Sequence, residues 1–150
     1  MPLYSTLIEN FLRQHQDIHT VVGHSLGGFS LLYTFYRVPS LPVDRIILLA
    51  PPGEASDFIS VFQKTLRISN RTVQLVTRHF AERYRVTPDF FSSLKFAPTL
   101  KVKGLIIHDE HDLEAPYRYA VPLNKHWPHS RLVTTRGFGH NLKSPLVVKE

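Results

Sequence analysis

The sequence contains no cysteine in its 150 residues. This absence excludes disulfides, a thiolate nucleophile and a cysteine-ligated metal. Long apolar runs are also missing, because no stretch approaches the roughly 18 residues that a membrane-spanning helix needs. Residues 1–4 place no basic region ahead of an apolar segment, as a secretory leader would. We therefore expect a soluble, cytoplasmic protein without a membrane partner.

Acidic residues are in the minority, with 12 Asp and Glu against 18 Lys and Arg, so the formal net charge is +6. Such an excess can attract nucleic acid, but a nucleic-acid interface concentrates its basic residues and interleaves them with aromatics. Here the basic residues are spread along the chain, which indicates a solvated surface and no nucleic-acid partner. Examples are Lys64, Arg67, Arg71, Arg78, Arg83, Arg85, Lys101 and Lys103.

Short apolar runs recur along the chain and alternate with helical patterns. Four of these runs predict buried strands, at residues 18–22, 45–50, 102–107 and 131–135. The alternation predicts one α/β domain with a parallel sheet and helices on both of its faces.

Helical spacing of apolar residues fills the stretches between these runs. Residues 2–14 predict a surface helix packed on the sheet, and residues 26–37 predict a second helix. A third runs from Pro116 to about Lys125, and Pro122 must kink or shorten it. A last helix is expected to open at Pro145.

Residues 54–98 carry more helix than a simple crossover between strands needs. We expect helices at about 54–67 and 72–84 and a short one where Thr87 caps Pro88. Because one helix normally suffices for a crossover, this stretch is interpreted as an inserted helical lid. It divides the domain 1–150 into residues 1–53, the insertion 54–98 and residues 99–150.

A tight turn, Gly23-His24-Ser25-Leu26-Gly27, joins the first strand to the helix after it. The strand, turn and helix around a G-x-S-x-G pattern predict a nucleophile elbow with Ser25 at its apex. We expect Gly23 and Gly27 to let neighbouring backbone pass without a Cβ clash. Ser25 would then stand exposed above the sheet.

A serine hydroxyl attacks at neutral pH only with an adjacent base, and that base needs a partner to fix its tautomer. Three residues that could supply these roles, Ser25, Asp112 and His140, each follow the carboxyl end of a predicted strand. Asp109 competes with Asp112 for the acid role. The residues alone leave this choice open.

These motifs together resemble the α/β-hydrolase family over nearly all of the chain. Residues 23–28 resemble the elbow of its lipase and esterase branches, residues 106–116 its acid loop, and residues 137–140 its histidine loop. The resemblance implies that Ser25 is the nucleophile, His140 the general base and then acid, and Asp112 the orienting carboxylate. The family's spacing between the strand and its acid favours Asp112 over Asp109, and Asp109 is then expected to be solvated or to cap the backbone.

The resemblance also implies that the N–H of Leu26 is one oxyanion donor. It implies an ester or related acyl substrate, most directly a carboxylic ester, and neither a cofactor nor a metal ion.

Several neighbouring residues admit a second interpretation. His24 is expected to support the site without acting as a catalyst. Residues 108–111 contain His, Asp and Glu, but their spacing fits no metal-ligand pattern. Tyr84, Phe90 and Phe91 could line an acyl pocket or pack within the lid.

The chain departs from the family pattern by beginning at the helix before the elbow strand. The family's first four strands and the loop with its second oxyanion donor are not in this sequence, so we expect the C-terminal half of a longer hydrolase. The elbow strand would have a bare edge open to self-association. The alternative to an active serine hydrolase is an inactive or partner-dependent fragment that serves as a non-catalytic interaction module.

Overall fold

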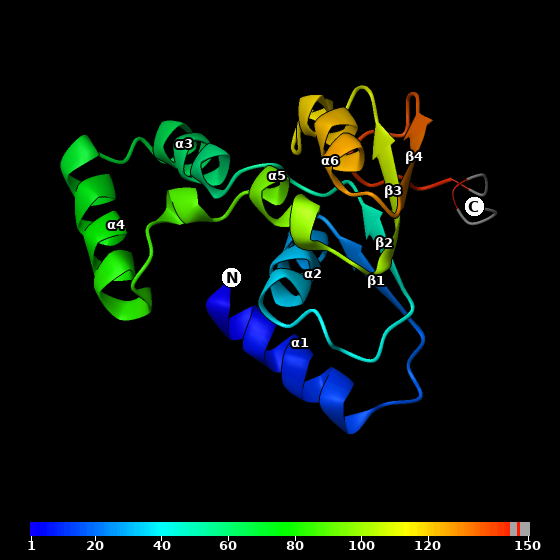
Figure 1. Ribbon diagram of the computed structural model, residues 1–150. Helices are drawn as coiled ribbons and strands as arrows, with labels where there is room; N and C mark the ends of the chain where they lie inside the picture. The colour runs from blue at the N-terminus through cyan, green and yellow to red at the C-terminus, as the bar shows by residue number, and fades with distance from the viewer. Residues whose placement is uncertain (145–146, 148–150) are drawn as a thin grey trace. The chain divides into compact units, whose positions relative to one another are not determined.

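A computed structural model describes residues 1–144 and Val147 (Figure 1). The chain divides into two compact units, one made of Met1–Gly53 with Ser93–Glu150 and the other of Glu54–Ser92. The first unit contains the sheet, and the second is helical. The short helices α5 (Ser93–Phe96) and η2 (Ala97–Thr99), placed in the insertion by the sequence analysis, belong to the first unit.

Four parallel strands form one sheet in the order β1-β2-β3-β4. They are β1 (Thr20–His24), β2 (Arg45–Leu49), β3 (Lys103–Asp109) and β4 (Ser130–Thr135). This arrangement confirms the predicted α/β class and its parallel sheet. Each strand ends at the same edge of the sheet, so the four loops that follow lie close together.

One face of the sheet is covered by helices α2 (Leu26–Arg37) and α6 (Ala120–His126), with α5 in contact with both. The β2 side chains of Ile46 and Leu48 are completely buried on this face. Next to α6, the Trp127 ring lies so close to Gly104 that a Cβ there would stand 2.4 Å from it. Only glycine admits the indole at this position.

Part of the other face is covered by the chain that follows β4. Leu142 is buried with Ala50 and Ile107, and the ring of Phe138 packs against this cluster. Val147 also contacts it. The helix expected to open at Pro145 falls on residues outside those described.

Helix α1 (Pro2–Gln14) packs mainly on α2, and the prediction that its apolar face lies on the sheet is wrong. Arg37 on α2 donates to the Ser5 hydroxyl at 2.8 Å, and Leu12 is buried. By contrast, Leu3 and Leu7 are each 66% exposed. The predicted helix is therefore confirmed, but only part of its apolar face is buried.

Helix α6 begins later than expected, because a 3-10 turn, η3 (Tyr117–Tyr119), precedes it. Pro122 lies in the first turn of α6, where backbone N–H groups have no intrahelical partner. At this position the proline removes no hydrogen bond within the helix.

The second unit contains α3 (Ala55–Thr65), α4 (Asn70–Tyr84) and η1 (Pro88–Phe90). Ser69 caps α4 by accepting from the Thr72 N–H at 3.1 Å, whereas Thr87 makes no side-chain cap to η1. No residue of α3 or α4 is buried, and an apolar pocket of about 240 Å³ is lined by both helices. The role of this unit as a lid stays a prediction.

The aromatic residues of the second unit pack against one another. Phe91 is 1% exposed, with ring centroids 5.4 Å from Phe90 and 5.8 Å from Phe80. The Tyr84 ring lies 4.7 Å from the Phe80 ring, with the two ring planes tilted by 51°. These contacts favour packing within the unit over an acyl pocket for these rings.

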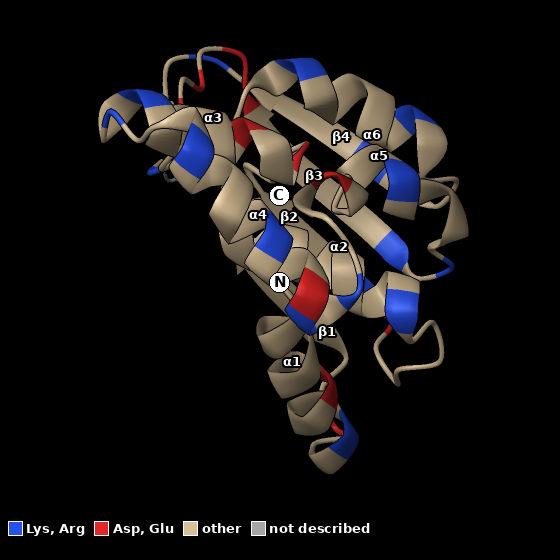
Figure 2. Cartoon of the chain, turned by 90° about the vertical axis from the view of Figure 1, so that its left-hand side faces the viewer, with Lys and Arg blue, Asp and Glu red and all other residues tan. Residues whose placement is uncertain are grey.

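Lys and Arg lie on several separate elements, including α4, α5 and α6 (Figure 2). Within residues 1–144 and Val147, no helix combines the length and the apolar character that crossing a membrane requires.

Candidate active site

Ser25 occupies the single residue between β1 and α2. Its backbone φ of 52° is unusual for a residue with a side chain, and its N–H donates to the Leu49 carbonyl at 2.8 Å. Its hydroxyl makes no cap to α2. The turn therefore presents the hydroxyl away from the helix backbone, as a nucleophile elbow requires.

The close approach that sustains this turn is between Gly23 and Gly28. A Cβ at Gly23 would stand 2.6 Å from the Gly28 nitrogen, and a Cβ at Gly28 would stand 2.9 Å from the Gly23 carbonyl oxygen. At Gly27 a Cβ would meet nothing within 4 Å. The steric role predicted for Gly27 is therefore wrong, and Gly28 has it instead.

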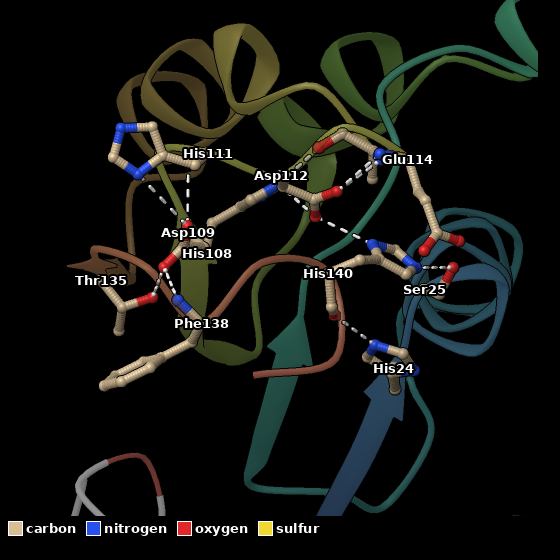
Figure 3. Close-up of polar contacts among 11 residues, drawn as sticks. His24, Ser25, His108, Asp109, His111, Asp112, Glu114, Thr135, Phe138 and His140 are labelled. Carbon is tan, nitrogen blue, oxygen red and sulfur yellow. Dashed lines mark hydrogen bonds and ion pairs between the residues drawn. The ribbon is translucent and has the colours of Figure 1, made fainter. Parts of the chain in front are cut away.

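The structure brings Ser25, His140 and Asp112 into one hydrogen-bonded row (Figure 3). The Nε2 atom of His140 lies 2.9 Å from Ser25 Oγ, and its Nδ1 atom lies 2.8 Å from Asp112 Oδ2. With its proton on Nδ1, the ring donates to the carboxylate and offers the Nε2 lone pair to the serine hydroxyl. The three predicted residues thus have the geometry of a nucleophile, a base and an orienting acid.

The Asp112 side chain is completely buried, and its second oxygen is also satisfied. Oδ1 accepts the N–H groups of Glu114 at 2.9 Å and Ala115 at 2.8 Å. A buried charge is tolerated when hydrogen bonds replace its hydration. These bonds hold Oδ2 toward His140 (Figure 3).

His108 supports Asp112 from the end of β3. Its Nε2 atom lies 2.8 Å from the Ala115 carbonyl oxygen and 3.3 Å from Asp112 Oδ2. Burial lowers the pKa of His108, although the Ala115 carbonyl and the Asp112 carboxylate act in the opposite direction. The lowered pKa favours the neutral form, and the proton of that form is on Nε2 because the Ala115 carbonyl oxygen can only accept. Its Nδ1 atom is buried and has no hydrogen-bond partner among the described residues.

Asp109 is the other candidate for the acid. Its side chain points to the face of the sheet opposite to that of its neighbour His108. Its carboxylate accepts from Thr135 Oγ1, the Phe138 N–H and the His111 N–H, each at 2.9 Å. Burial alone would raise the pKa of the Asp109 carboxyl, but these hydrogen bonds lower it to about 2. The expectation of a solvated Asp109 is wrong, while its capping role is present in the bond to His111.

His24 reaches across to the loop of His140. Its Nε2 atom lies 2.8 Å from the His140 carbonyl oxygen, and the two rings are 4.9 Å apart. The carbonyl can only accept, so the imidazole donates. His24 contacts the site without joining the row of Ser25, His140 and Asp112. Sequence reasoning gave it a supporting role but could not find a partner 116 residues away.

The remaining polar residues of this loop make other contacts. Glu110 pairs with Arg136 at 2.8 Å, and the His111 side chain is 71% exposed. Across the described part of the chain, no group of three or more His, Asp or Glu side chains is arranged to hold a metal ion.

The chain is similar to known proteins in sequence and in fold. No family model matches the chain. Proline iminopeptidase of Xylella fastidiosa (strain 9a5c) is 26% identical, in an alignment that covers 68% of this chain and 45% of that protein. An α/β hydrolase from a Medee basin deep-sea metagenome library matches with a TM-score of 0.66 and 17% identity, over 97% of this chain and 66% of that one. The chain has the α/β-hydrolase fold.

A second solved relative, the meta-cleavage product hydrolase of Pseudomonas fluorescens, has the same fold at a TM-score of 0.59 and 19% identity. It is matched over 91% of this chain and 62% of its own length. This α/β-hydrolase chain spans about half the length of the curated relative named above.

Within the α/β-hydrolase fold, the first residue of α2 follows the serine directly. Leu26 has this position, so its backbone N–H has no hydrogen-bond acceptor within the helix and is available to a ligand. The positive end of the helix dipole is directed toward the same point. An anion formed next to Ser25 would be stabilised by the Leu26 N–H and by the positive end of the α2 dipole.

Proposed function

We propose that this chain is a serine hydrolase that cleaves acyl bonds, with a carboxylic ester as its most direct substrate. The observation that supports the proposal is the unbroken row from Ser25 Oγ through the His140 ring to Asp112 Oδ2, with steps of 2.9 and 2.8 Å. Random placement of three residues so far apart in the sequence does not produce this row. It favours an enzyme over a non-catalytic module.

In the first half of the reaction, Ser25 Oγ attacks the carbonyl carbon of the substrate. His140 Nε2 takes the hydroxyl proton as the new C–O bond forms, and Asp112 stabilises the resulting imidazolium. The carbonyl oxygen becomes an oxyanion, which the Leu26 N–H and the α2 N-terminus stabilise. Collapse of this intermediate expels the alcohol, which receives the proton from His140 Nε2.

In the second half, water replaces the alcohol. His140 Nε2 takes a proton from the water, whose oxygen attacks the acyl carbon bound to Ser25. The second tetrahedral intermediate collapses with the proton returned to Ser25 Oγ, and the carboxylic acid leaves. The residues end in their starting protonation states.

An N-terminal peptide bond is a second candidate substrate. The observation that favours it is the similarity to proline iminopeptidase, at 26% identity over 68% of this chain. The same groups would serve an amide, except that an amine leaving group depends more strongly on the proton from His140. Hydrolysis of a short-chain nitrophenyl ester compared with a prolyl arylamide distinguishes the two.

The direct test is the intact mass of the purified chain after treatment with a fluorophosphonate. We expect one adduct, formed when Ser25 Oγ bonds to phosphorus and fluoride leaves. The Ser25→Ala variant and a heat-denatured sample should remain unlabelled. A folded wild-type sample without an adduct would refute the proposal, and an adduct that persists in Ser25→Ala would refute the assignment of the nucleophile.

A further inference from the structure

The loop that presents His140 is not held by close packing of its glycines. Gly137 and Gly139 have positive φ angles of 82° and 58°, and a Cβ at either would meet nothing within 4 Å. Glycine in open space has many accessible backbone states. Something other than steric confinement must therefore select the conformation that places the ring beside Ser25.

One hold on this loop comes from the end of β3. The Asp109 carboxylate is completely buried and accepts the Phe138 N–H at 2.9 Å. Its bond to Thr135 Oγ1 joins it to the last residue of β4. Charge-assisted bonds to backbone N–H groups are stronger than neutral ones. Asp109 thus holds the main chain just before His140.

A second hold comes from the elbow. His24 precedes Ser25 directly, and its Nε2–H donates to the His140 carbonyl at 2.8 Å. The contact couples the backbone of the nucleophile to the backbone of the base. This bond to the carbonyl uses neither ring nitrogen of His140, so Nδ1 remains bonded to Asp112 and Nε2 to Ser25.

We infer that Asp109 and His24 clamp the main chain of the His140 loop from two elements and act as positioning residues for the reaction. The inference rests on the proposed function for its catalytic consequence. Asp112 sets the rotation of the His140 imidazole, whereas the clamp sets the position of the ring relative to Ser25 Oγ. Displacement of a reacting group by about 1 Å can cost about 10²-fold in rate.

The test compares three variants with the wild type: Asp109→Asn, His24→Leu and His24→Gln. Asn offers one acceptor oxygen where the carboxylate has two, and Leu offers no donor. Gln retains an N–H donor, so it should restore much of what Leu loses. His19→Leu is the matched control, because His19 is also an exposed histidine but pairs with Asp44 away from the loop.

Two measurements are made on each variant. Amide hydrogen exchange at Phe138, Gly139 and His140 reports the loop directly and needs no activity. Ester hydrolysis reports kcat and KM separately. We expect faster exchange and a 10-fold to 100-fold lower kcat in Asp109→Asn and His24→Leu, with KM within about twofold and the pH profile unchanged in shape.

Wild-type exchange and kcat in both His24→Leu and Asp109→Asn would overturn the clamp. A new limb in the pH profile of His24→Leu would also overturn it, because His24 would then act in proton transfer. If Asp109→Asn does not fold, Thr135→Val removes a single donor to the same carboxylate and replaces it in the test. If the wild type is not labelled by fluorophosphonate, the proposed function fails, while the exchange data still decide whether the clamp exists.

Discussion

The Nε2 atom of His108 lies 3.3 Å from Asp112 Oδ2, and both side chains are completely buried. Its neighbour Asp109 points the other way, because successive residues of a strand face opposite sides of the sheet. The last two residues of β3 therefore support different loops. His108 supports the loop of the acid, and Asp109 supports the loop of the base.

Acidification should destabilise the protein through His108. Because burial lowers the pKa of His108 in the folded state, the unfolded chain binds more protons as the pH falls below about 6.5. The free energy of unfolding should consequently fall from pH 7 to pH 5, as measured by urea denaturation. In His108→Gln, which retains a donor for the Ala115 carbonyl, the fall should be smaller. Equal falls in both proteins would show that His108 does not contribute.

Replacing the orienting acid should remove most of the activity without unfolding the protein. Asp112→Asn has no charge to stabilise the imidazolium and presents an amide that can hold the wrong tautomer of His140. We expect kcat for an ester to fall by about 10³ to 10⁴, with KM little changed. Glu114→Gln is the control, since its side chain is exposed in the same loop. Comparable losses in both variants would contradict the role of Asp112.

The elbow glycines should differ sharply in their tolerance of a methyl group. Gly23→Ala places its Cβ 2.6 Å from the backbone nitrogen of Gly28, so backbone must shift. Overpacking of this kind costs about 1 to 3 kcal/mol. Gly27→Ala enters open space within a helix and should stabilise by about 0.5 to 1 kcal/mol. Thermal denaturation measures both, and similar Tm values for the two variants would contradict the packing described here.

The outer edge of β1 should promote association between copies of the chain. Among the described residues, β1 pairs only with β2, and Val22 is 60% exposed. Unpaired strand edges recruit other strands, and lysine on an edge strand opposes this. We expect light scattering to show self-association that Val22→Lys reduces. The control Val61→Lys changes a valine of 59% exposure in α3. A monomeric wild type would contradict the expectation.

The sequence was sufficient to predict the sheet and the three residues that meet beside it. Apolar runs mark buried parallel strands, and the carboxyl ends of such strands share one edge, so Ser25, Asp112 and His140 were expected together before any coordinates. The beginnings of the strands were less certain. Strand β1 begins at Thr20 and not at Ile18, because pairing with β2 begins at Arg45.

Contacts across the sheet could not be predicted from local pattern. Whether Asp109 is solvated depends on the distant Thr135 and Phe138, and no local spacing signals that pairing. The same holds for His24, whose partner lies 116 residues away. The spacing of apolar residues in α1 predicted that the segment is a helix. It could not predict which surface would cover its apolar face, because that depends on the tertiary neighbours.

The order of the strands has a consequence for how the site comes into being. Ser25 and His140 are 115 residues apart, and β2 and β3 lie between the strands that precede them. Their hydrogen bond can form only after three parallel pairings are in register, and a slip of one residue would turn the supporting side chains to the wrong face. Such non-local pairings form slowly during folding. Recovery of fluorophosphonate labelling after dilution from denaturant would therefore time the completion of the whole sheet.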